Sequence, residues 1–219
     1  MLKGAAAIKI PYGKMSFQQL RRISDLSDEY ASSKLHATTR QDIQIHYVDL
    51  NRTPALWAEL EKDEVTLREA CGNAVRNVTA SETAGIDKDE PFDVSPYADA
   101  LFRYFLRNPI SQEMGRKFKV SFSATDEDTG LSYMHDLGFI PKIIDEKRGF
   151  KVMLGGGLGY FMDQYQNKKK SQHHPTVLIQ PNHPSHPILP STSRSHLHTA
   201  AKYKWILERQ TRCACGKHL

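Results

Sequence analysis

The chain has 219 residues, of which 39% are hydrophobic and 25% are charged. These proportions are ordinary for a globular protein and exclude a wholly disordered one. No stretch contains the roughly 18 consecutive apolar residues that a membrane span requires, and three cysteines are too few for a disulfide framework. We therefore expect a cytoplasmic protein that has no membrane partner.

The positive charge is concentrated in the C-terminal part of the chain. Residues 1–160 contain 21 Lys and Arg against 23 Asp and Glu, whereas residues 161–219 contain 9 against 2. Five of the eleven prolines fall within residues 175–190, where they exclude a long helix or strand. We predict a Pro- and His-rich basic tail over 161–219 that is largely disordered, in which only residues 199–210 could form a helix. Because the body of the chain is not basic, no nucleic-acid partner is expected.

Hydrophobic spacing in the N-terminal region predicts two helices and a strand. Ser16 with Gln19 forms a capping box that opens the first helix. Its apolar stripe comprises Phe17, Leu20, Ile23, Leu26 and Tyr30. Residues 40–48 alternate like a strand, whose apolar face comprises Ile43, Ile45 and Tyr47. Thr53 and Pro54 then open a second, shorter helix.

Two further helix starts are indicated after residue 60. Thr66 with Glu69 has the spacing of a second capping box. Ser95 and Pro96 open a helix rich in aromatic residues.

The remaining strands follow from alternation and from short apolar runs. Residues 117–123 alternate, with the apolar side chains Phe118, Val120 and Phe122 on one face. The runs 139–144 and 150–154 flank the turn sequence DEKRG and indicate a hairpin. Because strands and helices do not alternate strictly, we predict an α+β fold.

Two predicted strands carry rows of cationic or hydrogen-bonding side chains on one face. Period two gathers Arg40 with Gln44 and His46, and Lys117 with Lys119. Arg76 lies between these strands in the segment GNAVRNVTA. Convergent Arg and Lys side chains suit a polyanion or a small oxyanion. On spacing alone, however, the ordinary interpretation of such rows is a solvated sheet face.

Other motifs carry weaker signals. The sequence GGGLG at 155–159 fits neither common phosphate-loop pattern, and a close backbone approach explains it better. Cys213, Cys215 and His218 lack the paired spacing of structural zinc sites, so no metal site is expected. The acidic run 126–128 is interpreted as a surface turn, and Cys71 as a small buried hydrophobic residue.

Four sequence blocks, taken together and in order, carry a family resemblance. They are KIPYGKMSFQQLRRISDLSDEYASSKLHATTRQDIQIHYV, ACGNAVRNVTAS, GRKFKVSFS and GFKVMLGGGLG. In this order they resemble the N-terminal half of the assimilatory siroheme-containing nitrite and sulfite reductases, over about residues 5–159. The resemblance implies a ferredoxin-like half-domain over 1–60 and an incomplete siroheme and [4Fe–4S]-type module over 61–160. The tail 161–219 has no counterpart in it.

The resemblance also implies a function and site residues. Members of this family are oxidoreductases that reduce sulfite to sulfide or nitrite to ammonia, with electrons from ferredoxin or a reductase subunit. The positions implied to contact siroheme are Arg40, Gln44, His46 and Arg116. The positions implied to bind and protonate the anion are Arg76, Lys117 and Lys119.

Three departures from the family pattern shape what is expected of this chain. Ala7 stands where the family has a further substrate-binding arginine, so the first strand is expected to be damaged. The cysteine pairs that hold the cluster are missing, and the family pattern ends at Tyr160. We therefore expect a fragment that is inactive alone, completed by a C-terminal half if that half is encoded separately. The alternatives are a non-catalytic interaction or regulatory module and, less favoured, a nucleic-acid binder acting through the tail.

Overall fold

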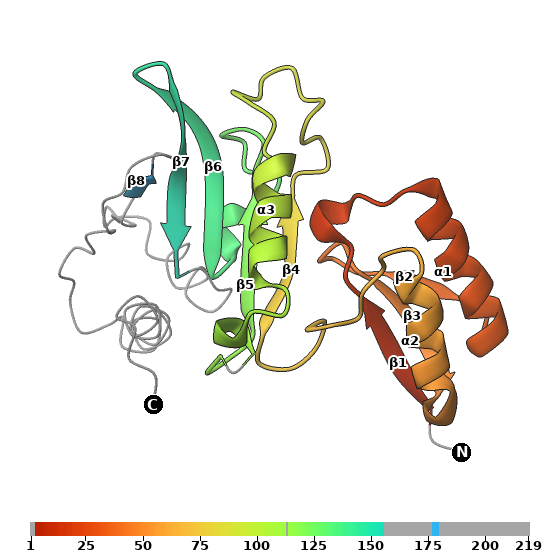
Figure 1. The fold of residues 1–219 in the computed structure, drawn as a ribbon. Helices are drawn as coiled ribbons and strands as arrows, with labels where there is room; N and C mark the ends of the chain where they lie inside the picture. The colour runs from red at the N-terminus through yellow and green to blue at the C-terminus, as the bar shows by residue number, and fades with distance from the viewer. Residues whose placement is uncertain (1–2, 113, 156–176, 180–219) are drawn as a thin grey trace, which may run out of the picture.

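The computed structural model describes residues 3–112, 114–155 and 177–179, which form two β-sheets with helices packed against them (Figure 1). The first sheet belongs to the red and orange N-terminal part, and the second to the yellow, green and blue part (Figure 1). No helix in these ranges is long and apolar enough to cross a membrane. The mixture of strands and helices confirms the predicted α+β fold class.

The first sheet has the strand order β1-β3-β2 and is antiparallel throughout. Its strands are β1 (Lys3–Ile8), β2 (Leu35–Ala37) and β3 (Ile43–Asp49). The helices α1 (Phe17–Tyr30) and α2 (Thr53–Glu61) complete its core. The largest fully buried side chains of this core are Ile8, Ile23, Ile45, Leu56 and Leu60.

Helix α1 begins as predicted but buries less of its apolar stripe. Ser16 accepts a hydrogen bond from the Gln19 backbone, and the Gln19 side chain accepts one from the Ser16 backbone, which confirms the capping box. Phe17 is 80% exposed and Leu20 is 44% exposed, so the stripe prediction is wrong for the first turn. Only the later part of the helix, from Ile23 onward, faces the sheet.

Strand β3 is shorter than predicted at its start and is irregular near its end. Arg40 precedes the strand and lies in a turn. Tyr47 has a left-handed φ of 66° and is 64% exposed, which contradicts its predicted place on the apolar face. The register with β1 shifts at the same point, so Val48 becomes the next buried residue.

The second sheet has the strand order β4-β5-β6-β7-β8. Its strands are β4 (Val75–Ala80), β5 (Phe118–Phe122), β6 (Leu137–Ile144), β7 (Lys147–Leu154) and β8 (Val177–Ile179). The pairs β4–β5 and β5–β6 are parallel, and the remaining pairs are antiparallel. Helix α3 (Ser95–Phe105) lies against the sheet (Figure 1). The aromatic part of their shared core comprises Phe92, Phe102, Phe118, Phe122 and Phe150.

Several local predictions for this second part have clear outcomes. The helix at Ser95 and the hairpin β6–β7 are confirmed, and the hairpin turns through Asp145 and Glu146, both at positive φ. Strand β8, which is three residues long and pairs with β7, falls within the tail that was predicted to be largely disordered. Residues 156–176 and 180–219, including the predicted helix at 199–210, lie outside the described ranges.

The capping box predicted at Thr66 and Glu69 is wrong, because no helix follows it. Thr66 forms an isolated β-bridge with Lys9, and Glu69 adopts a left-handed φ of 59°. Cys71 is exposed rather than buried. Long-range contacts thus decide the course of this segment over its local helix signal. The 3₁₀ turns of the chain are η1 (Pro11–Gly13), η2 (Leu50–Arg52), η3 (Pro109–Ser111) and η4 (Ser132–Met134).

Candidate functional site

Arg40 reaches from the turn before β3 into the second sheet. Its Nη2 donates to the carbonyl oxygens of Asn77 and of Val120, at 3.3 Å from the latter, and Nη1 lies 3.4 Å from Thr79 Oγ1. Burial lowers the pKa of Arg40 to about 10, which leaves the guanidinium charged at neutral pH. Its Nε is buried without a partner among the described residues. A buried cation with an unused donor is a candidate ligand contact.

The turn that carries Arg40 also holds the edge of the second sheet. Thr38 Oγ1 accepts from the backbone N–H groups of Arg40 at 3.2 Å and of Asp42 at 3.1 Å. Gln41 then places its amide on strand β4, where Oε1 accepts from Ala80 N at 3.1 Å and Nε2 donates to Ala80 O at 2.7 Å. The amide of Gln41 thereby forms with Ala80 the two hydrogen bonds that the backbone of a neighbouring strand would form. Sequence reasoning identified Arg40 and missed Gln41.

Gln44 and His46 share the face of β3 that is opposite the buried isoleucines. His46 Nε2 lies 3.2 Å from His36 Nδ1 on β2. Ala7 pairs in register with Gln44, so the position expected to carry an arginine adjoins this face. Strand β1 is complete over Lys3–Ile8, and the prediction that it is damaged is wrong.

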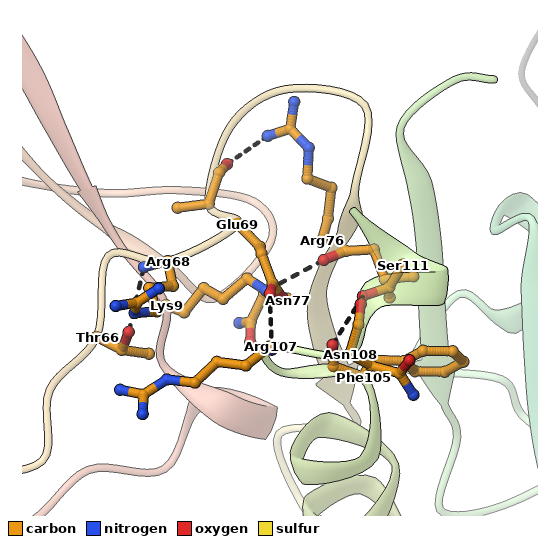
Figure 2. Close-up of polar contacts among 12 residues, drawn as sticks. Lys9, Thr66, Arg68, Glu69, Arg76, Asn77, Phe105, Arg107, Asn108 and Ser111 are labelled. Atoms are coloured by element: carbon orange, nitrogen blue, oxygen red, sulfur yellow. Dashed lines mark hydrogen bonds and ion pairs between the residues drawn. The ribbon is translucent and has the colours of Figure 1, made fainter. Parts of the chain in front are cut away.

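Arg76 is the second residue of β4 and is held by backbone carbonyls (Figure 2). Its Nε donates to Gly72 O at 3.2 Å, and its Nη1 donates to Ala70 O. These contacts fix the direction of a partly exposed guanidinium. Its Nη2 makes no hydrogen bond within the described part of the chain and remains available as a donor.

Lys119 and Lys117 flank the start of β5. Lys119 is partly buried, and its backbone N–H donates to Asp136 Oδ2 at 2.9 Å. Lys117 and Arg116 come just before the strand and are exposed. The predicted strand 117–123 is therefore one residue too long at each end.

Charge effects place four of the predicted cations in one region. The pKa of Lys119 is lowered first by burial and then by the positive charges of Arg40, Lys117 and Arg76, whereas Asp136 acts in the opposite direction. Such mutual repulsion requires proximity, because water and salt screen distant charges. Three cations and one carboxylate act on Lys119, so the net positive charge near its Nζ favours an anion.

The other three predicted residues are not joined to this group. No hydrogen bond or resolved charge effect among the described residues links Gln44, His46 or Arg116 to the four cations.

His135 belongs to this region, although sequence reasoning missed it. Its Nδ1 lies 2.7 Å from Leu131 O, so Nδ1 carries the proton and donates. Burial, with the charges of Arg40 and Lys119, lowers the pKa of His135 to about 4. The imidazole is therefore neutral at pH 7 and offers Nε2 as an acceptor. The sequence feature that could have revealed this residue is the pair His135-Asp136, which comes immediately before β6.

Buried hydroxyl groups hold the loop that leads to His135. Ser123 Oγ donates to Asp128 Oδ1 and lies 3.0 Å from Ser132 Oγ, and Ser132 N donates to Asp128 Oδ1 at 2.7 Å. The run 126–128 is thus a surface turn only for its first two residues. Asp128 is structural, because it satisfies the backbone of the loop.

Metal-ligand sets are absent from the part of the chain that the structure describes: no group of three His, Cys, Asp or Glu residues there could hold an ion. Cys213, Cys215 and His218 lie outside it, as does most of the GGGLG motif.

Two family models match this chain. The nitrite/sulfite reductase ferredoxin-like half domain matches residues 4–63, and the nitrite and sulphite reductase 4Fe-4S domain matches residues 71–173. Among solved structures, the Mycobacterium tuberculosis NirA protein is similar with a TM-score of 0.65 and 26% identity, over 70% of this chain and 28% of that one.

Curated relatives agree with these matches. An assimilatory ferredoxin-dependent nitrite reductase of Haloferax mediterranei is 33% identical over 155 residues, and a sulfite reductase [ferredoxin] of Mycolicibacterium paratuberculosis is 30% identical over 145 residues. These alignments cover 64% and 66% of this chain and 26% of each relative. The chain thus spans about a quarter of the length of these relatives. On these matches, the chain belongs to the family of nitrite and sulfite reductases.

Proposed function

We propose that this chain supplies the siroheme- and anion-contacting half of a reductase that converts sulfite to sulfide or nitrite to ammonia. The observation that carries the proposal is the reach of Arg40 onto β4 and β5, the strands that carry Arg76 and Lys119 and that Lys117 directly precedes. Two sheets bring these residues together from positions far apart in the sequence. On an ordinary solvated sheet face, we would not expect a partly buried lysine close to three other cations.

The residues present fit a cofactor that carries carboxylates on its rim. Arg40 has a buried, unused Nε donor, and Gln44 and His46 share one sheet face. We assign siroheme contacts to these three residues and to the exposed Arg116. Siroheme would supply the iron at which a bound sulfite or nitrite accepts electrons. The carboxylates on the rim of the cofactor would then accept charge-assisted hydrogen bonds from the cationic residues among these four.

Anion binding is assigned to Arg76, Lys117 and Lys119. Arg76 offers Nη2 in a fixed direction, and the two lysines contribute charge. Because burial and neighbouring cations lower the pKa of Lys119, its Nζ releases a proton more readily than an ordinary lysine does. A bound anion offsets the repulsion and raises that pKa again. Lys119 is therefore suited both to hold the oxyanion and to pass a proton to it.

Electron supply requires more than these 219 residues contain. The three cysteines cannot provide four thiolates for a [4Fe–4S] cluster, and Cys71 is exposed on a turn. We propose that the chain is inactive without a cluster-bearing C-terminal half. Ferredoxin is the proposed electron donor, since the similar reductases named above are ferredoxin-dependent.

Co-expression with the cluster-bearing C-terminal half of a homologue tests the proposal. Lys117→Ala and Lys119→Ala should retain siroheme, measured by absorbance, and should lower sulfite or nitrite turnover by about tenfold or more. Arg40→Ala should lower siroheme content itself. Lys142→Ala, which breaks a surface ion pair with Asp126, is the control and should change neither.

Two results would contradict the proposal. If both lysine variants turned over substrate at the rate of the parent, the surface that carries Arg76, Lys117 and Lys119 would be an ordinary solvated sheet face. A complemented protein that binds no siroheme would favour a non-catalytic interaction or regulatory module.

A further inference from the structure

A buried ion pair joins the first sheet to the segment before β4. Lys9 Nζ lies 3.4 Å from Glu69 Oε2, and the two side chains are 2% and 5% exposed. The same Nζ donates to Val75 O at 3.1 Å. Burial lowers the pKa of Lys9, Glu69 opposes that change, and the charge of Arg76 adds to it. Lys9 therefore lies near Arg76, although no bond joins the two cations.

Glu69 uses its second oxygen as well (Figure 2). Oε1 accepts from Arg107 N at 2.8 Å and from Gln112 Nε2 at 2.5 Å. The carboxylate thus connects Lys9 with the chain that follows α3. A buried ion pair contributes little net stability, because the free energy lost on desolvating two charges is about as large as that gained from their attraction. The ion pair between Lys9 and Glu69 is therefore better explained by the local geometry that it imposes than by stability.

The contacts of this ion pair bracket the loop that holds Arg76. Glu69 is the neighbour of Ala70, whose carbonyl accepts from Arg76 Nη1, and Val75 is the neighbour of Arg76 itself. The second carbonyl partner, Gly72, lies between these two points and has a left-handed φ of 83°. Lys9 therefore fixes both ends of the 69–75 loop.

We propose that Lys9 and Glu69 are positioning residues for Arg76, which hold the 69–75 loop so that its carbonyls direct the guanidinium toward the anion. This proposal rests on the anion-binding role proposed for Arg76. It extends the site to residues that never touch substrate. Lys9 directly follows β1, two positions after the alanine that replaces the expected arginine.

The direct test observes Arg76 itself in the full chain. In protein labelled with ¹⁵N-arginine, the Nε–H resonance of Arg76 is assigned by its loss in Arg76→Lys. Lys9→Met should shift or broaden that resonance and leave most other arginine signals in place. Arg22→Met is the matched control, because it breaks a different ion pair, 2.6 Å long, with Asp63. It should leave the Arg76 resonance unchanged.

A double variant separates positioning from stability. Lys9→Met leaves Glu69 as an unpaired buried charge, whereas Lys9→Met with Glu69→Gln leaves none. The double variant should regain thermal stability relative to the single variant. The Arg76 resonance should stay displaced in it, because the contact to Val75 O is still missing. If Lys9→Met does not fold, the double variant carries the test alone, because it lacks the contact to Val75 O and buries no unpaired charge.

The proposal is overturned if the Arg76 resonance is unchanged in the folded variants, or if it returns together with stability in the double variant. This readout requires no anion. Turnover of the complemented protein reports separately on the proposed function. A displaced Arg76 resonance, together with parent turnover in the complemented Lys117→Ala and Lys119→Ala variants, would refute the function and support the positioning.

Discussion

Asn77 shows how a single uncharged side chain joins the two sheets. It is fully buried on β4, and its Nδ2 donates to Ile10 O at 2.6 Å and to Arg40 O at 3.2 Å. Both acceptors belong to the first part of the chain. The amide orientation is fixed, because the opposite one would place an oxygen against two carbonyls.

Asn77→Ala should therefore lower the free energy of unfolding by about 1–3 kcal/mol, because it removes two hydrogen bonds, of which only Ile10 O keeps another donor, Gly13 N. Urea denaturation of the full chain measures it. Asn51→Ala, on an exposed turn, is the control and should change stability by less than about 0.5 kcal/mol. A loss at Asn77 no larger than at Asn51 would show that the sheets are not joined there.

His135 gives stability a defined pH dependence. Its pKa is lowered to about 4 in the folded chain from an ordinary value of 6.5, so the unfolded chain binds more protons between these values. Stability from this residue is present above pH 6.5 and is lost as the pH falls toward 4. Asp42 acts in the opposite sense, because burial raises its pKa to about 6.

The variant His135→Asn keeps a donor for Leu131 O and removes the titration. Its stability relative to the parent should rise by about 1–3 kcal/mol between pH 6.5 and pH 4, allowing for partial hydration of the ring. Thermal unfolding at several pH values measures this difference. Asp42→Asn should show a slope of opposite sign. A difference between His135→Asn and parent that does not vary with pH would contradict the assignment.

At the scale of elements, the sequence predicted those whose signals are local. The start of α1 follows from adjacent capping residues, the start of α3 from Ser95 and Pro96, and the β6–β7 hairpin from apolar runs around a turn. The errors arose where distant residues decide. Glu69 forms a long-range ion pair instead of capping a helix, and the left-handed Tyr47 shifts the pattern of β3.

The loop between β5 and β6 depends on two close backbone approaches. A Cβ on Gly130 would lie 2.2 Å from Phe122 O, and one on Gly138 would lie 2.2 Å from Ser132 O. Gly130→Ala and Gly138→Ala should each destabilise the chain by more than about 3 kcal/mol, since backbone must move in both. Gly115→Ala, which meets nothing within 4 Å, should cost less than about 1 kcal/mol. Equal stability in all three variants would refute this close packing.

At the scale of the whole molecule, the site was only partly accessible from the sequence. Residue types and the family resemblance predicted Arg40, Arg76, Lys117 and Lys119 as site residues, and Arg40 reaches the strands β4 and β5 on or beside which the other three lie. Gln41, Asp136 and His135 were missed, because their roles depend on which strands become neighbours. Spacing along one strand cannot show that a turn of the first sheet meets an edge of the second.

The central claim, that Arg40 and the residues assigned with it bind a carboxylate-rimmed tetrapyrrole, is tested most directly by titrating siroheme into the full chain and following its absorbance. We expect a saturable change that Arg40→Met weakens by about tenfold or more, because a buried charged donor is lost. Arg103→Met is the matched control, since it makes the same change at an exposed arginine of α3 that pairs with Asp99. It should leave the affinity within about twofold of the parent. A change that does not saturate, or equal affinity in parent and Arg40→Met, would contradict the account.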